Sequence, residues 1–116
     1  MRVFIEHRVL RFRRPVVTSY GTIAERELLE LHIIDADGIS GRGEAAPLEP
    51  YDGVPFERVR AALEGYATVF AERDELPSGD LLDACRRVAD VPQALAAVDM
   101  ALWDRAARRE GRPVAA

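Results

Sequence analysis

The chain has little of several features that would by themselves define a class of protein. It contains one cysteine, Cys85, which excludes an internal disulfide and is typical of proteins from a reducing compartment. No apolar run approaches the roughly 20 residues that a membrane-spanning helix needs. Positive charge is not in excess, because the formal net charge is −4, so neither nucleic acid nor an anionic membrane is favoured as a partner. The N-terminus becomes charged too early for a signal peptide, and we predict a cytoplasmic protein.

The residues that are present have the mixture of a soluble globular domain. Apolar residues make up 48% and charged residues 31% of the 116 residues, which is enough for one domain with a modest core. Cys85 is expected to be a small buried apolar residue in that core rather than a reactive thiol.

The first part of the chain has the pattern of β-strands. Residues 3–12 are β-branched, aromatic or charged and contain neither Gly nor Pro, which predicts a strand that Pro15 ends. Its apolar residues change alternation phase, which predicts a bulge near Val9. Residues 25–35 predict a second strand, with Leu29, Leu31 and Ile33 on one face and Glu30 and His32 on the other.

A turn at residues 35–38 is expected to lead into a third strand at about residues 39–46. The residues on its inward face are mostly small: Ile39, Gly41, Gly43 and Ala45. Glycine in a strand allows another backbone to approach closely. We therefore expect an element, and a helix is the expected one, to pack tightly against this strand.

The second part of the chain predicts three helices. Apolar residues recur at spacings of three and four from Phe56 to Phe70, a second helix is expected at residues 80–89, and a third runs from Pro92 to Glu110 before a capping glycine, Gly111. The third helix is almost without polar residues from Ala94 to Trp103, so it should be covered on two sides. The predicted fold class is α+β, a three-stranded antiparallel meander followed by three helices.

Between the first two predicted strands, residues 15–24 are expected to form a loop that carries no charge. An uncharged loop with apolar residues suits a lid over a small ligand, because closure should exclude water. The alternative is a loop that packs on its own sheet.

Three motifs together give the chain a family resemblance. They are Thr18-Ser19-Tyr20-Gly21-Thr22, then Gly41-Arg42-Gly43-Glu44-Ala45-Ala46-Pro47, and then Ala97-Val98-Asp99-Met100-Ala101-Leu102-Trp103-Asp104 followed by Gly111-Arg112-Pro113-Val114. In this order the chain resembles the N-terminal domain of the enolase superfamily, of the mandelate racemase and muconate lactonizing enzyme type, in its muconate cycloisomerase-like branch. The resemblance implies a capping domain at residues 1–111, with residues 112–116 beginning the connection to a barrel domain that the chain lacks. We expect the chain to be a cut one for this reason.

The resemblance also implies what the complete enzyme would do. It would be a Mg²⁺-dependent isomerase, cycloisomerase, epimerase or dehydratase-type lyase that removes a proton next to a carboxylate of a small substrate. The barrel would be the partner that supplies the metal ligands and catalytic bases. No catalytic residue and no metal ligand is assigned to this chain, which is expected to be inactive alone. Whether the enzyme is a homo-oligomer is left open.

In such a domain two loops would select the substrate, here residues 15–24 and 47–53. Val17, Tyr20 and Ile23 could form an apolar wall, while Thr18, Ser19 and the Tyr20 hydroxyl could hydrogen bond to a ligand. Leu48 and Tyr51 would approach from the second loop. The predicted substrate-binding residues are Val17, Thr18, Ser19, Tyr20, Ile23, Leu48 and Tyr51.

Acidic residues near these loops do not form a metal motif. Glu44, Glu49 and Asp52 lie on a strand end and a loop without the spacing of a metal site. Glu44 is expected instead to order the loop through a hydrogen bond or ion pair with an arginine.

On the third helix, Asp99 and Asp104 are expected to be interface or capping residues. Trp103 is expected to pack between this helix and the barrel. The apolar face of the same helix motivates an alternative function, a free-standing, non-catalytic module that binds a partner or itself.

Overall fold

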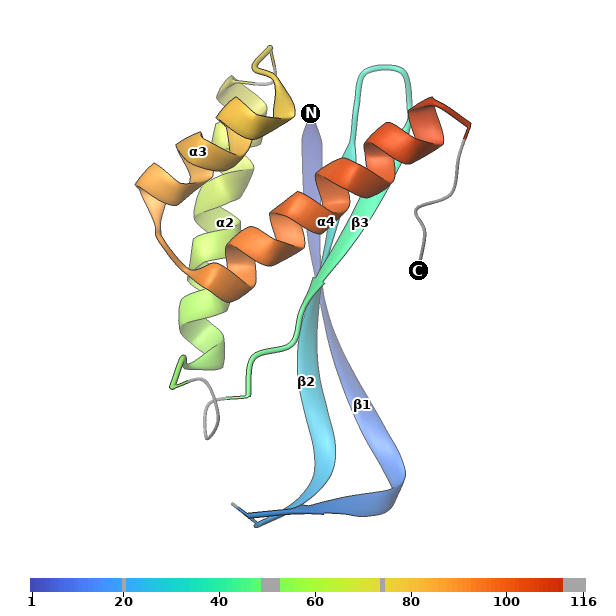
Figure 1. The fold of residues 1–116 in the computed structure, drawn as a ribbon, viewed down its shortest axis with the longest axis vertical. Coiled ribbons are helices and arrows are strands. Elements are labelled where there is room, and N and C mark those ends of the chain that lie inside the picture. The colour runs from blue at the N-terminus through green and yellow to red at the C-terminus, as the bar shows by residue number, and fades with distance from the viewer. Residues whose placement is uncertain (20, 49–52, 74, 112–116) are drawn as a thin grey trace.

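The computed structural model describes residues 1–19, 21–48, 53–73 and 75–111. It contains a three-stranded antiparallel sheet in the order β1-β2-β3, with three helices packed on one of its faces (Figure 1). The predicted α+β class, a meander followed by three helices, is confirmed. The elements are β1 (Arg2–Thr18), β2 (Gly21–Ile34), β3 (Ser40–Ala45), α2 (Phe56–Glu72), α3 (Ser78–Val88) and α4 (Pro92–Arg109).

The first two strands are much longer than the third. β3 pairs with β2 only from Leu29 to Ile34, whereas β1 and β2 continue to pair as far as Thr18 and Gly21. Residues 9–18 and 21–27 therefore form a two-stranded ribbon, which we call the arm. Figure 1 shows the arm projecting well beyond the end of β3 and away from the helices.

The prediction that Pro15 ends the first strand and that residues 15–24 form a loop is wrong. Val16 pairs with Ile23 and Val17 with Thr22, so these residues form the end of the arm. β-branched residues favour strands, and Gly21, at φ +130°, adopts a backbone conformation that side-chain-bearing residues rarely tolerate at this tight turn.

The predicted bulge near Val9 is also misplaced. Val9 pairs regularly with Glu27, and the register of β1 against β2 shifts later, between Arg11 and Val16. Pro15 lies inside this irregularity, where a residue without an N–H does not have to donate to the strand ladder. The irregularity is thus where the strand accommodates its proline.

The close approach predicted for the third strand is confirmed, and its partner is α4. A Cβ atom added to Gly43 would collide with the backbone of Ala97, and one added to Gly41 would collide with the backbone carbonyl of Ala101. Small residues on both elements let the helix backbone lie directly on the strand. Ala97 and Ala101 face β3 in this way, while Leu95, Val98 and Leu102 are buried among the other helices and the core. The predicted two-sided covering of this helix is therefore confirmed.

The core lies between the sheet and the helices. Leu29, Leu31 and Ile33 are fully buried on the inner face of β2, as their alternation predicts. The buried face of α2 agrees with the predicted stripe from Val59 to Phe70. Tyr66 is fully buried there, and its hydroxyl donates a hydrogen bond of 2.5 Å to the carbonyl of Ala89.

The short helix α3 differs slightly from its prediction. It begins at Ser78 rather than Asp80. Leu81 and Cys85 are buried as expected, and burial raises the pKa of the Cys85 thiol to about 11. Val88, expected to point inward, is 54% exposed because it is the last residue of the helix.

The turn between β2 and β3 is tied to the C-terminal end of α4. The carboxylate of Asp35 accepts hydrogen bonds from Arg105 at 3.0 Å and from Arg109 at 2.8 Å. Burial alone would raise the pKa of Asp35, but the backbone N–H of Ile39 and these guanidinium groups more than offset it, and the pKa is lowered. Together with Gly111, at φ +74° after the helix end, these contacts fix where α4 stops.

Candidate functional site

The predicted substrate-binding residues of the first segment lie at the far end of the arm. Val17 is 81% exposed and Ser19 is also exposed. The backbones of Thr18 and Ile23 belong to the paired strands, but their side chains, like the whole of Tyr20, lie outside the described residues. The segment therefore lies at the tip of the projecting arm, in paired strands rather than in a loop. Whether these residues contact a substrate stays a prediction.

The second predicted segment follows β3. Pro47 is buried and Leu48 is half-buried, while Tyr51 lies outside the described residues. Ala46 to Leu48 leave the sheet at the end from which the arm projects (Figure 1). The two segments that sequence analysis assigned to substrate selection thus begin at the same end of the sheet.

A residue that sequence analysis missed joins the base of the arm to the end of β3. Arg26, on β2 at the base of the arm, donates a hydrogen bond of 2.6 Å from its Nη2 to the backbone carbonyl of Ala46. Glu44 was expected to order this region, but its carboxylate is exposed and faces outward on β3. Glu44 lies opposite Glu30 on the outer face of the sheet, because odd and even positions of a strand face opposite ways. Whether it orders the segment stays a prediction, because residues 49–52 lie outside the described residues.

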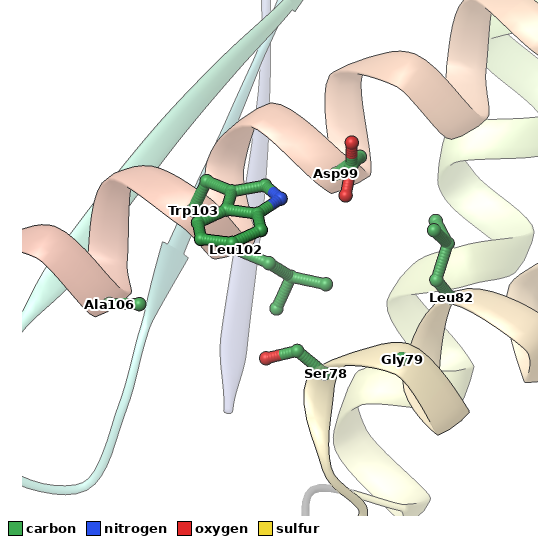
Figure 2. A pocket seen from close by; sticks show the side chains of 7 residues that line it. All are labelled: Ser78, Gly79, Leu82, Asp99, Leu102, Trp103 and Ala106. Carbon is green, nitrogen blue, oxygen red and sulfur yellow. The ribbon is translucent and has the colours of Figure 1, made fainter. Parts of the chain in front are cut away.

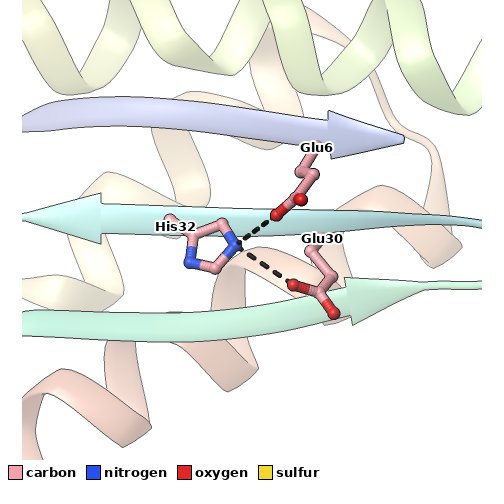
Figure 3. Close-up of side chains that lie close together, drawn as sticks. All are labelled: Glu6, Glu30 and His32. Carbon is pink, nitrogen blue, oxygen red and sulfur yellow. Dashed lines mark hydrogen bonds and ion pairs between the residues drawn. The ribbon is translucent and has the colours of Figure 1, made fainter. Parts of the chain in front are cut away.

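A charged cluster covers the outer face of the sheet, which carries no helix. It contains Glu6 of β1 and Glu30 and His32 of β2, whose side chains meet as Figure 3 shows. The Nε2 of His32 lies 3.2 Å from Glu30 Oε2 and 3.6 Å from Glu6 Oε2. Arg8 binds the other oxygen of Glu30 at 2.6 Å.

Glu30 is the centre of this cluster. It is only 5% exposed, and the hydrogen bond from Arg8 lowers the pKa of its carboxyl against the burial that would raise it. A carboxylate at this depth must be paired or hydrogen-bonded. Arg8 and His32 satisfy that need, so the arrangement is explained as a neutralised structural cluster.

The same cluster is the one place in the described residues where three metal-binding side chains converge, with ligand atoms within 4.8 Å of one another. Mg²⁺ requires near-octahedral oxygen ligands, whereas one of these ligands is an imidazole and Glu30 is already bound by Arg8. These residues therefore do not fit Mg²⁺.

A cavity of about 300 Å³ lies between α3 and α4 (Figure 2). Trp103 borders it and is 67% exposed, and Asp99 is the only charged residue in its lining. Among the described lining residues the side chains are mostly apolar, with a hydroxyl from Ser78 and a carboxylate from Asp99, so the cavity has the composition of a packing surface. The lining residues are Ser78, Gly79, Leu82, Asp99, Leu102, Trp103 and Ala106.

Asp104, next to this cavity in sequence, has a structural role. Its carboxylate accepts a hydrogen bond of 2.8 Å from the backbone N–H of Arg42 and pairs with Arg108 one turn later. It thus fastens α4 to β3, in agreement with the expected interface role.

None of the helices in the described part of the chain combines the length and the apolarity that crossing a membrane requires.

Comparison with known proteins gives this geometry a family. The family described as mandelate racemase / muconate lactonizing enzyme, N-terminal domain, matches residues 1–116. The chain belongs to this family. The predicted resemblance to the enolase superfamily is confirmed, and these similarities offer no support for the alternative of a free-standing interaction module.

Individual members of the family with known activities are similar over most of the chain. An L-Lys-D/L-Arg epimerase from Desulforapulum autotrophicum is 33% identical over 90% of this chain and 30% of its own length. An o-succinylbenzoate synthase from Geobacillus stearothermophilus is 28% identical over 97% of this chain and 31% of its own length. The chain thus spans about a third of the length of the relatives that it matches.

Solved structures agree with the fold. A dipeptide epimerase from Methylococcus capsulatus, crystallised with Mg and the dipeptide L-Arg-D-Lys, is 28% identical with a TM-score of 0.71, covering 94% of this chain and 31% of its own. A dipeptide epimerase from Enterococcus faecalis, crystallised with Mg and L-Leu-L-Tyr, has a TM-score of 0.85 at 17% identity over 94% of this chain and 31% of its own, and it supports the fold alone.

Proposed function

We propose that residues 1–111 are the substrate-selecting cap of a two-domain, Mg²⁺-dependent enzyme that removes a proton next to a carboxylate. The observation that carries the proposal is the family match over the whole chain, combined with an arm that projects a largely uncharged tip away from the body. In this proposal residues 112–116 begin the connection to a barrel domain, and the enzyme is cytoplasmic. Relatives named as an L-Lys-D/L-Arg epimerase, a hydrophobic dipeptide epimerase and an o-succinylbenzoate synthase favour an epimerase, another isomerase or a lyase of this kind.

The cap's own part in the reaction is to enclose and select. Val17 and the other residues at the arm tip would cover one side of the substrate, and Leu48 and Tyr51 would approach from the segment after β3. Enclosure by uncharged side chains excludes water, which strengthens the electrostatic interactions within a site. Mg²⁺, when bound to the complete enzyme, stabilises the negative charge that develops on the substrate carboxylate. Since the cluster of Glu6, Glu30 and His32 does not fit that ion, no step through it is assigned to the described residues of this chain.

A domain exchange tests the proposal. Residues 1–111 replace the corresponding domain of a characterised dipeptide epimerase, and kcat/KM is measured with Mg²⁺ over a panel of dipeptides. We expect the chimera to keep epimerase activity and to change its order of preference among the dipeptides.

The matched variant is Val17→Asp at the arm tip of the chimera, with Val88→Asp, at the exposed end of α3, as the control. Val17→Asp is expected to reorder the preferences, because it puts charge into the enclosed side of the site, whereas Val88→Asp should not. If the chimera and its Val17→Asp variant both keep the parent epimerase's order of preference among the dipeptides, the selecting role is refuted.

A further inference from the structure

The geometry points to Arg26 as a positioning residue that couples the arm to the segment after β3, so that both halves of the proposed cap move as one unit. This inference rests on the proposed function for its consequence in catalysis, but the hydrogen bond that carries the coupling belongs to this chain. In sequence, Arg26 is separated from Ala46 by the rest of β2, the turn and β3, and its side chain bonds the two segments.

The ladder of paired residues between β2 and β3 stops before Ala46. The last pair between β2 and β3 is Leu29 with Ala45. Ala46 comes next and is followed by Pro47, which has no N–H and cannot extend a ladder. The carbonyl of Ala46 therefore leaves the sheet without a strand partner on β2.

The side chain of Arg26 takes the place of that strand partner. Arg26 precedes Leu29 by three residues and reaches along the sheet to the Ala46 carbonyl at 2.6 Å. Its side chain is half-buried, and in the described part of the chain its guanidinium forms no ion pair, while its Nε is buried without a hydrogen-bond partner. Among the described residues no carboxylate neutralises this half-buried charge, and the contact that the structure shows is to a backbone carbonyl. The hydrogen bond from this guanidinium group holds the carbonyl of Ala46 in place.

The backbone of Arg26 belongs to the arm. It lies opposite Leu10 in the arm, at a point where β2 pairs with β1 alone. Any change in the twist of the arm moves the Cα of Arg26 and, through the hydrogen bond, moves Ala46. The segment from Ala46 onward is also anchored at its far end, where Val54 packs against the core. Ala46 is thereby tied to the arm, and Val54 is tied to the core.

The coupling is tested first on the 116-residue chain itself. The variants are Arg26→Met, which keeps the aliphatic stem but cannot donate, and Arg26→Lys, which keeps a charge and a donor. Arg11→Met is the matched control: it removes the same charge from the same arm, but the Arg11 side chain is 79% exposed and only faces Glu25 at 3.6 Å.

Hydrogen exchange of residues 46–54 is the measurement. We expect about tenfold faster exchange in Arg26→Met, the effect of losing one hydrogen bond from a charged donor, with Arg26→Lys in between and Arg11→Met unchanged. Exchange in Arg26→Met equal to that of the wild type would overturn the coupling, whatever the chain does in an enzyme.

The catalytic consequence is tested in the active domain-exchange chimera described above. Arg26→Met is expected to raise KM by about tenfold and to level the preferences among dipeptides, with kcat changed much less, because the catalytic groups lie in the barrel. Arg26→Lys should recover part of the lost selectivity.

A fall in kcat at unchanged KM, or an equal effect of Arg11→Met, would reject the positioning role while leaving the proposed function standing. Conversely, a chimera without selectivity of its own would refute the proposed function, and the hydrogen-exchange result would still decide the coupling.

Discussion

Two buried polar side chains show how single residues stabilise this domain. Glu30 is held on the outer face of the sheet by Arg8, and Tyr66 lies in the core with its hydroxyl bonded to the carbonyl of Ala89. Each places a polar atom where water does not reach, and each has the partner that such burial requires. Glu30 is a charged residue at a buried position. The strand pattern does not show which residue pairs with its carboxylate.

Tyr66 makes a pH-dependent prediction. Burial raises the pKa of its hydroxyl from 10.0 to about 12. Because the folded state favours the protonated form, this contribution to stability is complete below the unfolded pKa of 10.0 and is lost as the pH rises towards 12. Tyr66→Phe should cost about 1 kcal/mol at neutral pH through the lost hydrogen bond, and its deficit relative to the wild type should shrink across that alkaline window.

Urea unfolding of both proteins as a function of pH measures this difference. The chain has no lysine, so lysine titration does not obscure the alkaline range. Cys85, whose pKa burial also raises, is present in both proteins, and its charge is a further cause of the raised pKa of Tyr66. A deficit that stays constant up to the alkaline end would contradict the raised pKa.

At the scale of elements, the contact between β3 and α4 determines how the domain is assembled. Gly41 and Gly43 on the strand meet Ala101 and Ala97 on the helix, backbone against backbone. Asp104 then bonds the Arg42 N–H from the helix side. This contact orients α4, and with it the exposed face that carries Met100 and Trp103.

Gly43→Ala tests that contact. The added methyl group would overlap the backbone of Ala97, which cannot rotate away as a side chain can. We expect a loss of about 2–3 kcal/mol in the free energy of unfolding, typical of overpacking, or a chain that no longer folds. Gly79→Ala in α3 is the control, because a Cβ there meets nothing and alanine favours a helix by about 1 kcal/mol. Thermal and urea unfolding compare the two, and equal effects would contradict the close packing.

At the scale of the whole molecule, the helices bury one face of the sheet, and the described residues leave two apolar regions exposed. One is the arm, whose apolar residues Val9, Leu10, Phe12, Val16 and Val17 are exposed. The other is the surface of α4 around Trp103, beside the cavity that α3 completes (Figure 2). Exposed apolar surface on this scale is typical of sites that another domain covers.

The fluorescence of Trp103, the single tryptophan of the chain, reports whether another domain covers this surface. Trp103 is 67% exposed in this chain, so its fluorescence should be that of an indole in water and should be readily quenched by iodide. In a chain joined to its barrel domain, we expect emission to shift to shorter wavelength and quenching to fall, because the indole becomes buried. Leu82→Ser, in the same cavity lining, should weaken the shift, whereas Val88→Ser should not. Unchanged emission in the two-domain protein would mean that the barrel does not cover this surface.

The sequence by itself determined the elements, their order and the inner face of the domain. Alternation in residues 29–33, the three- and four-residue spacing of α2, and the glycines opposite the alanines all follow from periodicity and side-chain size, which are local properties. Tertiary structure alone decided that Pro15 lies within a strand, because pairing across the arm overrides the local signal of a proline. It also decided that Arg26 holds the start of the segment after β3, since that contact depends on where β3 leaves β2 and on which way each side chain points. Such contacts join residues about 20 positions apart in sequence, and local patterns carry no information about them.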